Sequence, residues 1–265
     1  MSAAAVRAAD LARIARGLER AAAVLGSFTA GAIDHVLKER GDPLTEADLA
    51  VNRVLHQTLP NRGEGWLSEE TADDPERLGC SRVWIVDPID GTREFVEGIP
   101  EWCVSIGLVE DGVPVAGGIM NPASGQTVIG SVETGIEMNG VPVRVSARPS
   151  LEGAVVLVSR NEVRRGEWER LRDAPFRVRP CGSVAYKLAL VAAGVADLTW
   201  TLLPKSEWDV AAGTALVNAG GGRVVHADGA EPAFNRPDPR LAALLAGPPG
   251  LLDGLRRDWP APGSS

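Results

Sequence analysis

The sequence is most constrained by residues 83–92, where an apolar stretch runs directly into two aspartates, a glycine and a threonine. Residues 83–86 are apolar and mostly β-branched, as expected of a strand covered on both faces. Pro88 and the glycine should end this strand, which leaves Asp87 and Asp90 at its carboxyl end. Two carboxylates 4 Å apart repel by about 4 kcal/mol at an effective dielectric near 20, so such a pair usually shares a cation. The segment therefore predicts a cation site at the end of a buried strand.

A buried site of this kind needs a large core, and the composition allows one. The chain has 265 residues, 45% of them hydrophobic and 23% charged, which fits one large domain or two closely packed halves. Its formal charge of -8 argues against a nucleic-acid polymer as partner. Cys80, Cys103 and Cys181 lack the spacing of a disulfide framework or a zinc site. With no signal-peptide pattern and no apolar stretch of membrane-spanning length, we expect a cytoplasmic protein.

Hydrophobic spacing predicts the elements of the first half of the chain. Apolar residues at helical intervals indicate helices over 11–25 and 47–55. Extended segments at 102–109 and 113–120 are joined by an Asp-Gly turn, and a further strand after residue 125 completes an antiparallel meander. Residues 1–148 are therefore expected to form an α+β half that carries most of the acidic motifs.

Strands and helices alternate in the second half. Residues 149–265 are expected to form an α/β half that packs on the first as one structural unit. The tail from Pro237 carries no chemical motif. The expected strands lie at 154–159, 176–179, 197–200 and 223–226, and the expected helices at 163–171, 185–193 and 210–218.

Four other acidic residues stand in motifs that have a structural explanation on their own. The pair Glu69-Glu70 follows a loop and reads as solvated surface. Asp48 comes three residues after Thr45, which is the spacing of a capping box. Asp209 lies in the expected first turn of a helix, where a carboxylate meets free backbone amides. None of these motifs predicts chemistry by itself.

Taken together in this order, the motifs resemble the inositol monophosphatase superfamily of metal-dependent, lithium-sensitive phosphatases, which includes the 3'(2'),5'-bisphosphate nucleotidases. The resemblance spans about residues 40–225. It implies a layered α-β-α-β-α sandwich of the fructose-bisphosphatase and inositol-monophosphatase type, built from α+β and α/β parts. The matching motifs are Leu44-Thr45-Glu46-Ala47-Asp48 with Ser68-Glu69-Glu70, residues 84–92, and Trp208-Asp209-Val210-Ala211-Ala212-Gly213 leading to Ala219-Gly220-Gly221.

The resemblance implies a set of metal ligands. It assigns metal binding to Glu70, the second glutamate of its pair, to Asp87, Asp90 and Asp209, and to the main-chain oxygen of Ile89. Oxygen-only donors of this kind suit a hard cation, and no cysteine or histidine cluster is present to favour zinc. The expected cofactor is Mg²⁺, as two or three ions.

Catalytic roles for Asp48, Glu70 and Thr92 follow from the same resemblance. Asp48 is expected to reach a further magnesium through water, and Thr92 to orient and activate the attacking water. Gly91 and Thr92 should begin a short helix whose amides hold phosphate oxygens. Metal ions would lower the pKa of the attacking water and stabilise the leaving oxygen in an in-line displacement.

The motifs that bear on the substrate point in two directions. Arg93-Glu94 replaces the Thr-Asn pair common in inositol monophosphatases, and Leu202 stands where those enzymes have a glutamate that contacts the inositol ring. The first departure looks more like the bisphosphate nucleotidase branch, and both argue against inositol as substrate. Residues 101–108, in contrast, resemble the inositol branch as well as they resemble the nucleotidase branch.

A further motif, Gly182-Ser183 with Lys187, resembles the Gly-Ser-x-x-Lys pattern of the nucleotidases with an offset of one residue. It makes these three residues candidate substrate contacts. The alternative is that Lys187 is a solvated lysine beside an ordinary helix cap.

The sequence thus favours a Mg²⁺-dependent phosphomonoesterase that acts on 3'-phosphoadenosine 5'-phosphate or a related nucleotide. Inositol monophosphate is the close alternative, with histidinol phosphate and fructose 1,6-bisphosphate as more distant ones. A non-catalytic metal-binding member would be expected to lack a ligand, and none is missing. The expected partner is a small phosphate ester, without nucleic-acid polymer or membrane, in a chain that could form a homodimer.

Overall fold

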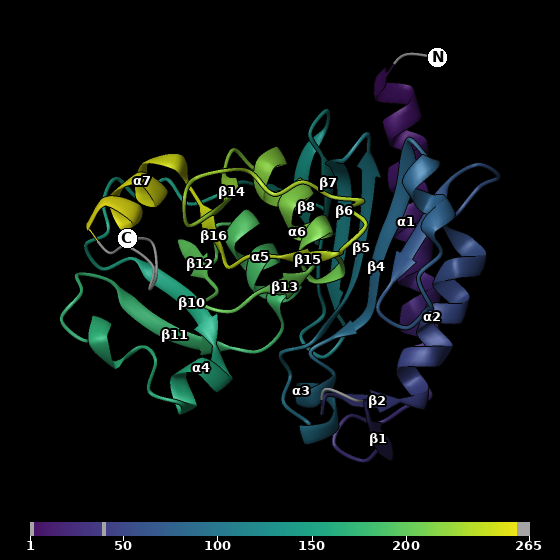
Figure 1. Ribbon diagram of the computed structural model, residues 1–265, viewed down its shortest axis with the longest axis horizontal. Coiled ribbons are helices and arrows are strands. Elements are labelled where there is room, and N and C mark those ends of the chain that lie inside the picture. The colour runs from purple at the N-terminus through teal and green to yellow at the C-terminus, as the bar shows by residue number, and fades with distance from the viewer. Residues whose placement is uncertain (1–2, 39–40, 259–265) are drawn as a thin grey trace.

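The computed structural model describes residues 3–38 and 41–258 and arranges them in five layers (Figure 1). A seven-stranded and a five-stranded sheet alternate with three layers of helices. Apolar cores fill the spaces between the layers. This order of helix, sheet, helix, sheet and helix confirms the predicted layered sandwich.

The first sheet is the antiparallel meander with one parallel strand added. Its strand order is β3-β4-β5-β6-β7-β8-β9, and only the β3–β4 pair is parallel. The predicted strands are confirmed, and β8 and β9 extend the meander further than expected. The bounds are Gly65–Ser68, Arg82–Asp90, Cys103–Glu110, Val113–Asn121, Gln126–Ser131, Gly135–Met138 and Val141–Val143 for β3 to β9.

Helices α1 (Ala3–Leu25) and α2 (Glu46–Thr58) cover the outer face of this sheet, as the helical spacing predicted. Their apolar stripes pack with the strands around Trp84, which is fully buried. The predicted capping box starts α2, because the Asp48 carboxylate accepts a hydrogen bond of 2.8 Å from the Thr45 amide. This cap fixes the Asp48 side chain at the N-terminus of α2.

Helices α5 (Val184–Ala192) and α6 (Glu207–Ala219) fill the layer between the two sheets. The backbone of α6 lies directly on strands β5 and β6, because both strands have a glycine at the contact. A Cβ atom on Gly107 would come within 2.8 Å of the Ala212 amide nitrogen, and one on Gly117 within 2.6 Å of its carbonyl oxygen. The close approach sets the position of the first turn of α6, which carries Asp209.

The second sheet has the order β11-β10-β12-β16-β14 and is covered on its far face by α7 (Pro249–Asp258). Strand β16 pairs with both β12 and β14, so the tail after Pro237 completes this sheet although the sequence predicted no element there. The bounds are Val155–Ser159, Arg177–Cys181, Leu198–Trp200, Arg223–His226 and Leu244–Gly247 for β10, β11, β12, β14 and β16.

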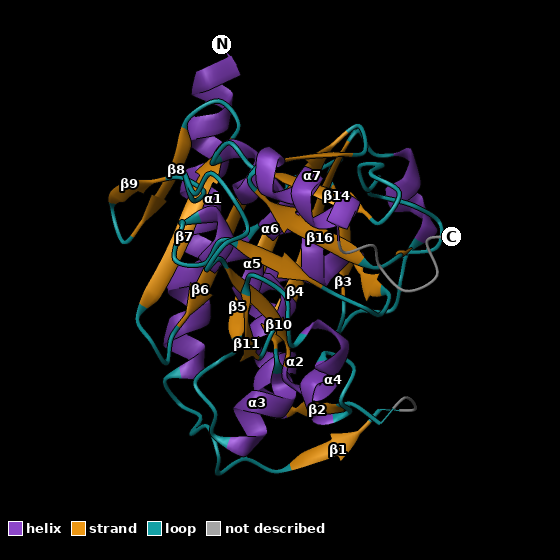
Figure 2. Ribbon diagram, turned by 90° about the vertical axis from the view of Figure 1, so that its left-hand side faces the viewer, coloured by secondary structure: helices purple, strands orange, loops and turns teal. Residues whose placement is uncertain are grey.

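Short elements surround the ends of the sheets. In Figure 2 the β1–β2 hairpin lies beside α3 at the lower end of the molecule, and β2 contacts α3. Strand β13 pairs with β15 ahead of α6. The bounds are His35–Leu37, Pro43–Thr45, Lys205–Ser206 and Arg240–Leu241 for β1, β2, β13 and β15, Thr92–Glu97 and Arg160–Arg164 for α3 and α4, and Pro75–Gly79 and Glu169–Leu171 for two 3₁₀ helices.

Strand β4 ends at Asp90, just before Gly91, which places Asp87 and Asp90 at its carboxyl end as predicted. The strand runs through Pro88 because its pairing with β5 becomes irregular after Asp87 and tolerates a residue without an amide hydrogen. One predicted helix was wrong. The helix expected over 163–171 is divided into α4 and a 3₁₀ helix, because Gly166 adopts a φ of +75° that no α-helix accommodates.

No helix within residues 3–38 and 41–258 has the combination of length and apolarity that crossing a bilayer requires.

Replacement of Gly117 by alanine should separate α6 from the sheet, because the new methyl group would meet α6 backbone that has no rotamer with which to escape. We expect Gly117→Ala to lower the free energy of unfolding by about 1–3 kcal/mol, measured by urea denaturation. Gly79→Ala is the matched control, since nothing lies within 4 Å of its Cβ position. Equal stability of the two variants would contradict the tight packing of α6.

Candidate active site

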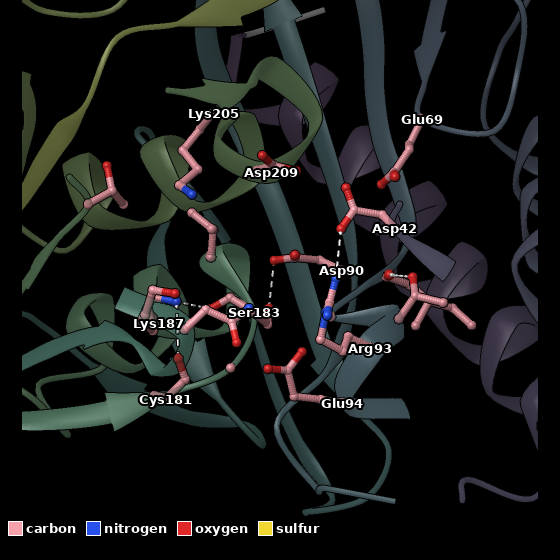
Figure 3. A pocket seen from close by; sticks show the side chains of 18 of the residues that line it. Asp42, Glu69, Asp90, Arg93, Glu94, Cys181, Ser183, Lys187, Lys205 and Asp209 are labelled. Carbon is pink, nitrogen blue, oxygen red and sulfur yellow. Dashed lines mark hydrogen bonds and ion pairs between the residues drawn. The ribbon is translucent and has the colours of Figure 1, made fainter. Parts of the chain in front are cut away.

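A cavity of about 240 Å³ opens at the carboxyl end of β4 (Figure 3). Its walls come from β4 and α3 on one side and from the first turns of α5 and α6 on the other. A second cavity of about 510 Å³ adjoins it and shares four lining residues with it. These are Asp42, Glu69, Lys205 and Asp209.

Three carboxylates from distant parts of the chain meet in this region. Glu69 follows β3, Asp87 belongs to β4 and Asp209 to the first turn of α6, and one oxygen of each lies within 4.8 Å of the others. Asp87 is almost fully buried, and its Oδ2 atom has no hydrogen-bond partner in the described part of the chain. A buried carboxylate that has an unpartnered oxygen and lies in a cluster with two further carboxylates fits a hard divalent cation.

The electrostatics of this cluster agree with its geometry. Burial raises the pKa of Asp87 well above its usual range, and the charges of Glu69, Asp90 and Asp209 raise it further. Burial likewise raises the pKa of Asp209 to about 8, with the charges of Asp90 and Glu69 as further causes. A bound cation would reverse both effects, because it stabilises the ionised carboxylates.

The structure places Glu69, and not Glu70, with Asp87. Strands β3 and β4 are parallel with Ser68 opposite Val86, so the next residues along the two strands lie side by side. The Glu69 amide also donates to the Val86 oxygen at 3.4 Å, which continues the pairing. Glu70, the second glutamate and the predicted metal ligand, lies outside this group of three carboxylates.

Glu70 instead pairs with Lys38 at the end of β1. The Lys38 ammonium lies 2.5 Å from a Glu70 oxygen and 2.6 Å from a Glu69 oxygen. Burial raises the pKa of Glu70 to about 7 against the lowering effect of Lys38. Lys38 was not among the predicted site residues, because no sequence motif predicts that the β1–β2 hairpin reaches the glutamates.

Asp90 connects the two halves of the molecule. One of its oxygens accepts hydrogen bonds from the Ser183 hydroxyl at 2.6 Å and from the Ala185 amide at 2.5 Å, both at the start of α5 (Figure 3). Its other oxygen accepts no hydrogen bond from residues 3–38 or 41–258. Ser183, a predicted substrate contact, thus positions a predicted metal ligand.

Asp48 and Thr92 are in contact, although they lie far apart in the sequence. The Thr92 hydroxyl is 3.1 Å from the Asp48 carboxylate and 2.9 Å from the main-chain oxygen of Ile89. Burial raises the pKa of Asp48, against hydrogen bonds from Thr45 and Thr92 that lower it. Asp48 therefore caps α2 with one oxygen and faces Thr92 with the other.

Gly91 makes the turn from β4 into α3. It has a φ of +94°, and a Cβ atom there would lie 3.1 Å from the Glu101 carbonyl oxygen. Thr92 then begins α3, as predicted, and the amides of this first turn have no helical partner. They line the cavity beside the carboxylates.

Gly182, Ser183 and Lys187, the candidate substrate contacts, all line the cavity. The Lys187 ammonium is not solvated, because it is buried and donates to the carbonyl oxygens of Ser183 at 2.6 Å and Cys181 at 3.3 Å. Lys205 also lines the cavity but lies outside the motifs that predict substrate contacts.

A five-layered sandwich with carboxylates gathered at the end of β4 defines a class of metal-dependent phosphatases. The chain belongs to the inositol monophosphatase family, whose model matches residues 4–256, and it is a phosphatase of that family.

Named relatives agree with this assignment. The fructose-1,6-bisphosphatase/inositol-1-monophosphatase of Thermotoga maritima is 34% identical over 208 residues, which cover 76% of this chain and 78% of that protein. The extragenic suppressor protein suhB of Bartonella henselae superposes with a TM-score of 0.81 at 28% identity, covering 94% of this chain and 97% of that one. CysQ of Bacteroides thetaiotaomicron, a bacterial member of the family, gives a TM-score of 0.75 at 26% identity, with 91% and 97% covered.

Removal of one charge from the cluster should stabilise the metal-free protein. In Asp87→Asn the Oδ1 atom can still accept the hydrogen bond from the Ile89 amide, while the repulsion is relieved. We expect the melting temperature in EDTA to rise by about 2–4 °C, which corresponds to about 1 kcal/mol. Added Mg²⁺ should stabilise the wild type but not the variant. A melting temperature below that of the wild type in EDTA would contradict the repulsion.

Proposed function

We propose that this phosphatase hydrolyses a small phosphate monoester with two or three Mg²⁺ ions, and that its substrate is 3'-phosphoadenosine 5'-phosphate or a related bisphosphate nucleotide. The observation that supports metal-dependent hydrolysis is the convergence of Glu69, Asp87 and Asp209, together with the unpartnered buried oxygen of Asp87. We place Asp90 and the main-chain oxygen of Ile89 in the same ligand set.

When bound, the Mg²⁺ ions would lower the pKa of the attacking water and neutralise the phosphate and the leaving oxygen. The carboxylates hold the ions, and their positions are fixed from both halves of the chain. Asp90 is fixed by Ser183 and Ala185, and Asp209 by the Ser206 amide, which donates to it at 2.9 Å. In each of these two carboxylates the Oδ1 atom is then available to bind metal.

Thr92 and Asp48 provide a path for the proton of the attacking water. The Thr92 oxygen can accept that proton while its own hydrogen passes to Asp48, 3.1 Å away. A buried carboxylate with a raised pKa suits this role, because a proton acceptor works best when its pKa approaches the ambient pH. The amides of Gly91 and Thr92 hold phosphate oxygens in this arrangement.

The choice of substrate rests on the cationic side chains that line the cavity. Arg93, Lys187 and Lys205 bring positive charge to the cavity, which suits a substrate with more than one anionic group. Leu202, which replaces the inositol-contacting glutamate, packs on the core of the second sheet's outer face. No carboxylate at that position is therefore available to bind a polyol.

Inositol 1-phosphate is the second candidate, because the relative from Thermotoga maritima bears the name of an inositol-1-monophosphatase. The same name includes fructose-1,6-bisphosphatase, so a sugar bisphosphate belongs among the test compounds.

Two matched variants test the choice of glutamate. Glu69→Gln should reduce kcat at least about 100-fold and weaken activation by Mg²⁺, since it removes a charged ligand from the cluster. Glu70→Gln should retain kcat within about 10-fold, since its carboxylate pairs with Lys38. Steady-state phosphate release over a range of Mg²⁺ concentrations measures both. A larger loss of kcat in Glu70→Gln than in Glu69→Gln would instead identify Glu70 as the metal ligand.

The substrate is tested by measuring phosphate release from 3'-phosphoadenosine 5'-phosphate and from inositol 1-phosphate side by side with Mg²⁺. We expect kcat/KM to be higher for the nucleotide, because its second phosphate can meet the cationic side chains of the cavity. Fructose 1,6-bisphosphate and histidinol phosphate serve as further comparisons. A hundredfold preference for inositol 1-phosphate would overturn the proposed substrate.

A further inference from the structure

Lysine is rare in this chain and confined to one region. The sequence contains only three lysines among 27 basic residues. All three line the cavities at the candidate active site, Lys187 the first cavity, Lys38 the second and Lys205 both. An ammonium is a compact charge on a flexible stem, whereas a guanidinium is a planar fork, so the two are not equivalent in a narrow site. The three lysines therefore call for individual explanations.

Two of the three are explained by contacts within the protein. Lys38 is paired with Glu69 and Glu70 at 2.6 and 2.5 Å. Lys187 donates to two carbonyl oxygens and is almost fully buried. Both ammonium groups thus have fixed partners.

Lys205 has no such partner. Within residues 3–38 and 41–258 no carboxylate pairs with its ammonium and no hydrogen bond holds it. It is half-buried in β13, four residues before Asp209, and its side chain extends into the space between Asp209 and Lys187 (Figure 3). A half-buried lysine without a partner at the boundary of two cavities is available to bind an anion.

The second cavity offers a further cation beside Lys205. Strand β15 pairs with β13 so that Arg240 lies opposite Ser206, the neighbour of Lys205, and Arg240 also lines this cavity. The guanidinium has no ion pair in the described part of the chain. At about 510 Å³ the cavity has room for a substituent that extends away from the carboxylates.

We infer that Lys205 determines substrate specificity by binding a second anionic group of the substrate, with Arg240 at the rim of the same subsite. The phosphate that is hydrolysed lies in the first cavity beside Gly91 and Thr92, and the second anion lies in the larger cavity. The inference rests on the proposed function for the place of the reacting phosphate. It adds the residue that separates bisphosphorylated from monophosphorylated substrates.

The test compares two nucleotides that differ only in the second phosphate, 3'-phosphoadenosine 5'-phosphate and adenosine 3'-phosphate. Lys205→Met should reduce kcat/KM for the first by about 10- to 100-fold, through KM rather than kcat, because a hydrogen bond to a charged group is lost. For adenosine 3'-phosphate kcat/KM should stay within about threefold. Lys205→Arg should restore only part of the loss, since it retains the charge but not the compact shape of the ammonium.

Arg62→Met is the control for loss of one positive charge. Arg62 is exposed and precedes the first residue of β3, whereas the site lies beyond the last residue of that strand. It should leave both nucleotides unaffected. Calorimetric titration of the same two compounds provides a readout that needs no turnover, and Lys205→Met should weaken binding of the bisphosphate alone.

Three results would overturn the inference: equal losses for both nucleotides, which would place Lys205 at the reacting phosphate; no loss for either; or a wild type that does not distinguish them. Failure of the proposed substrate looks different. In that case the wild type prefers inositol 1-phosphate, and the same variants are compared on inositol 1-phosphate and inositol 1,4-bisphosphate. A selective loss on the bisphosphate would then still support the role of Lys205.

Discussion

Mutual repulsion of buried carboxylates at the end of β4 is the constraint on which the rest of the site depends. Glu69, Asp87 and Asp209 bring one oxygen each within 4.8 Å of the others, and burial makes their charges costly. Because the three carboxylates repel one another, contacts from the surrounding fold must keep them together. The cation that such a cluster accommodates is then part of the stability of the folded chain as well as of its chemistry.

The fold holds the cluster by close backbone contacts and by caps. Helix α6 lies on the sheet at Gly107 and Gly117, which fixes the turn that carries Asp209. The start of α5 binds Asp90 through a hydroxyl and an amide from the second half of the chain. Asp48 shows that one carboxylate can cap a helix and also face the site, so the structural and the chemical interpretation of a capping box do not exclude each other.

Much of the fold followed from periodicity. The two helices that pack around Trp84, the antiparallel meander and the alternation of strands and helices in the second half were predicted. The motif at Asp87 and Asp90 indicated where the site lies. The tail was not predicted, because β16 becomes recognisable as a strand only between β12 and β14. The division of the helix expected over 163–171 depends on Gly166, whose positive φ is not visible from helical spacing.

The sequence by itself determined the family, the layered fold and the residue types of the site, because local motifs carry strand ends, caps and carboxylates. Only the tertiary structure distinguished Glu69 from Glu70, since that choice depends on the parallel register that sets Ser68 opposite Val86. It likewise showed that Lys187 is held by carbonyl oxygens whereas Lys205 is not. Such partners are distant in sequence and meet only when both sheets and the helices between them are packed.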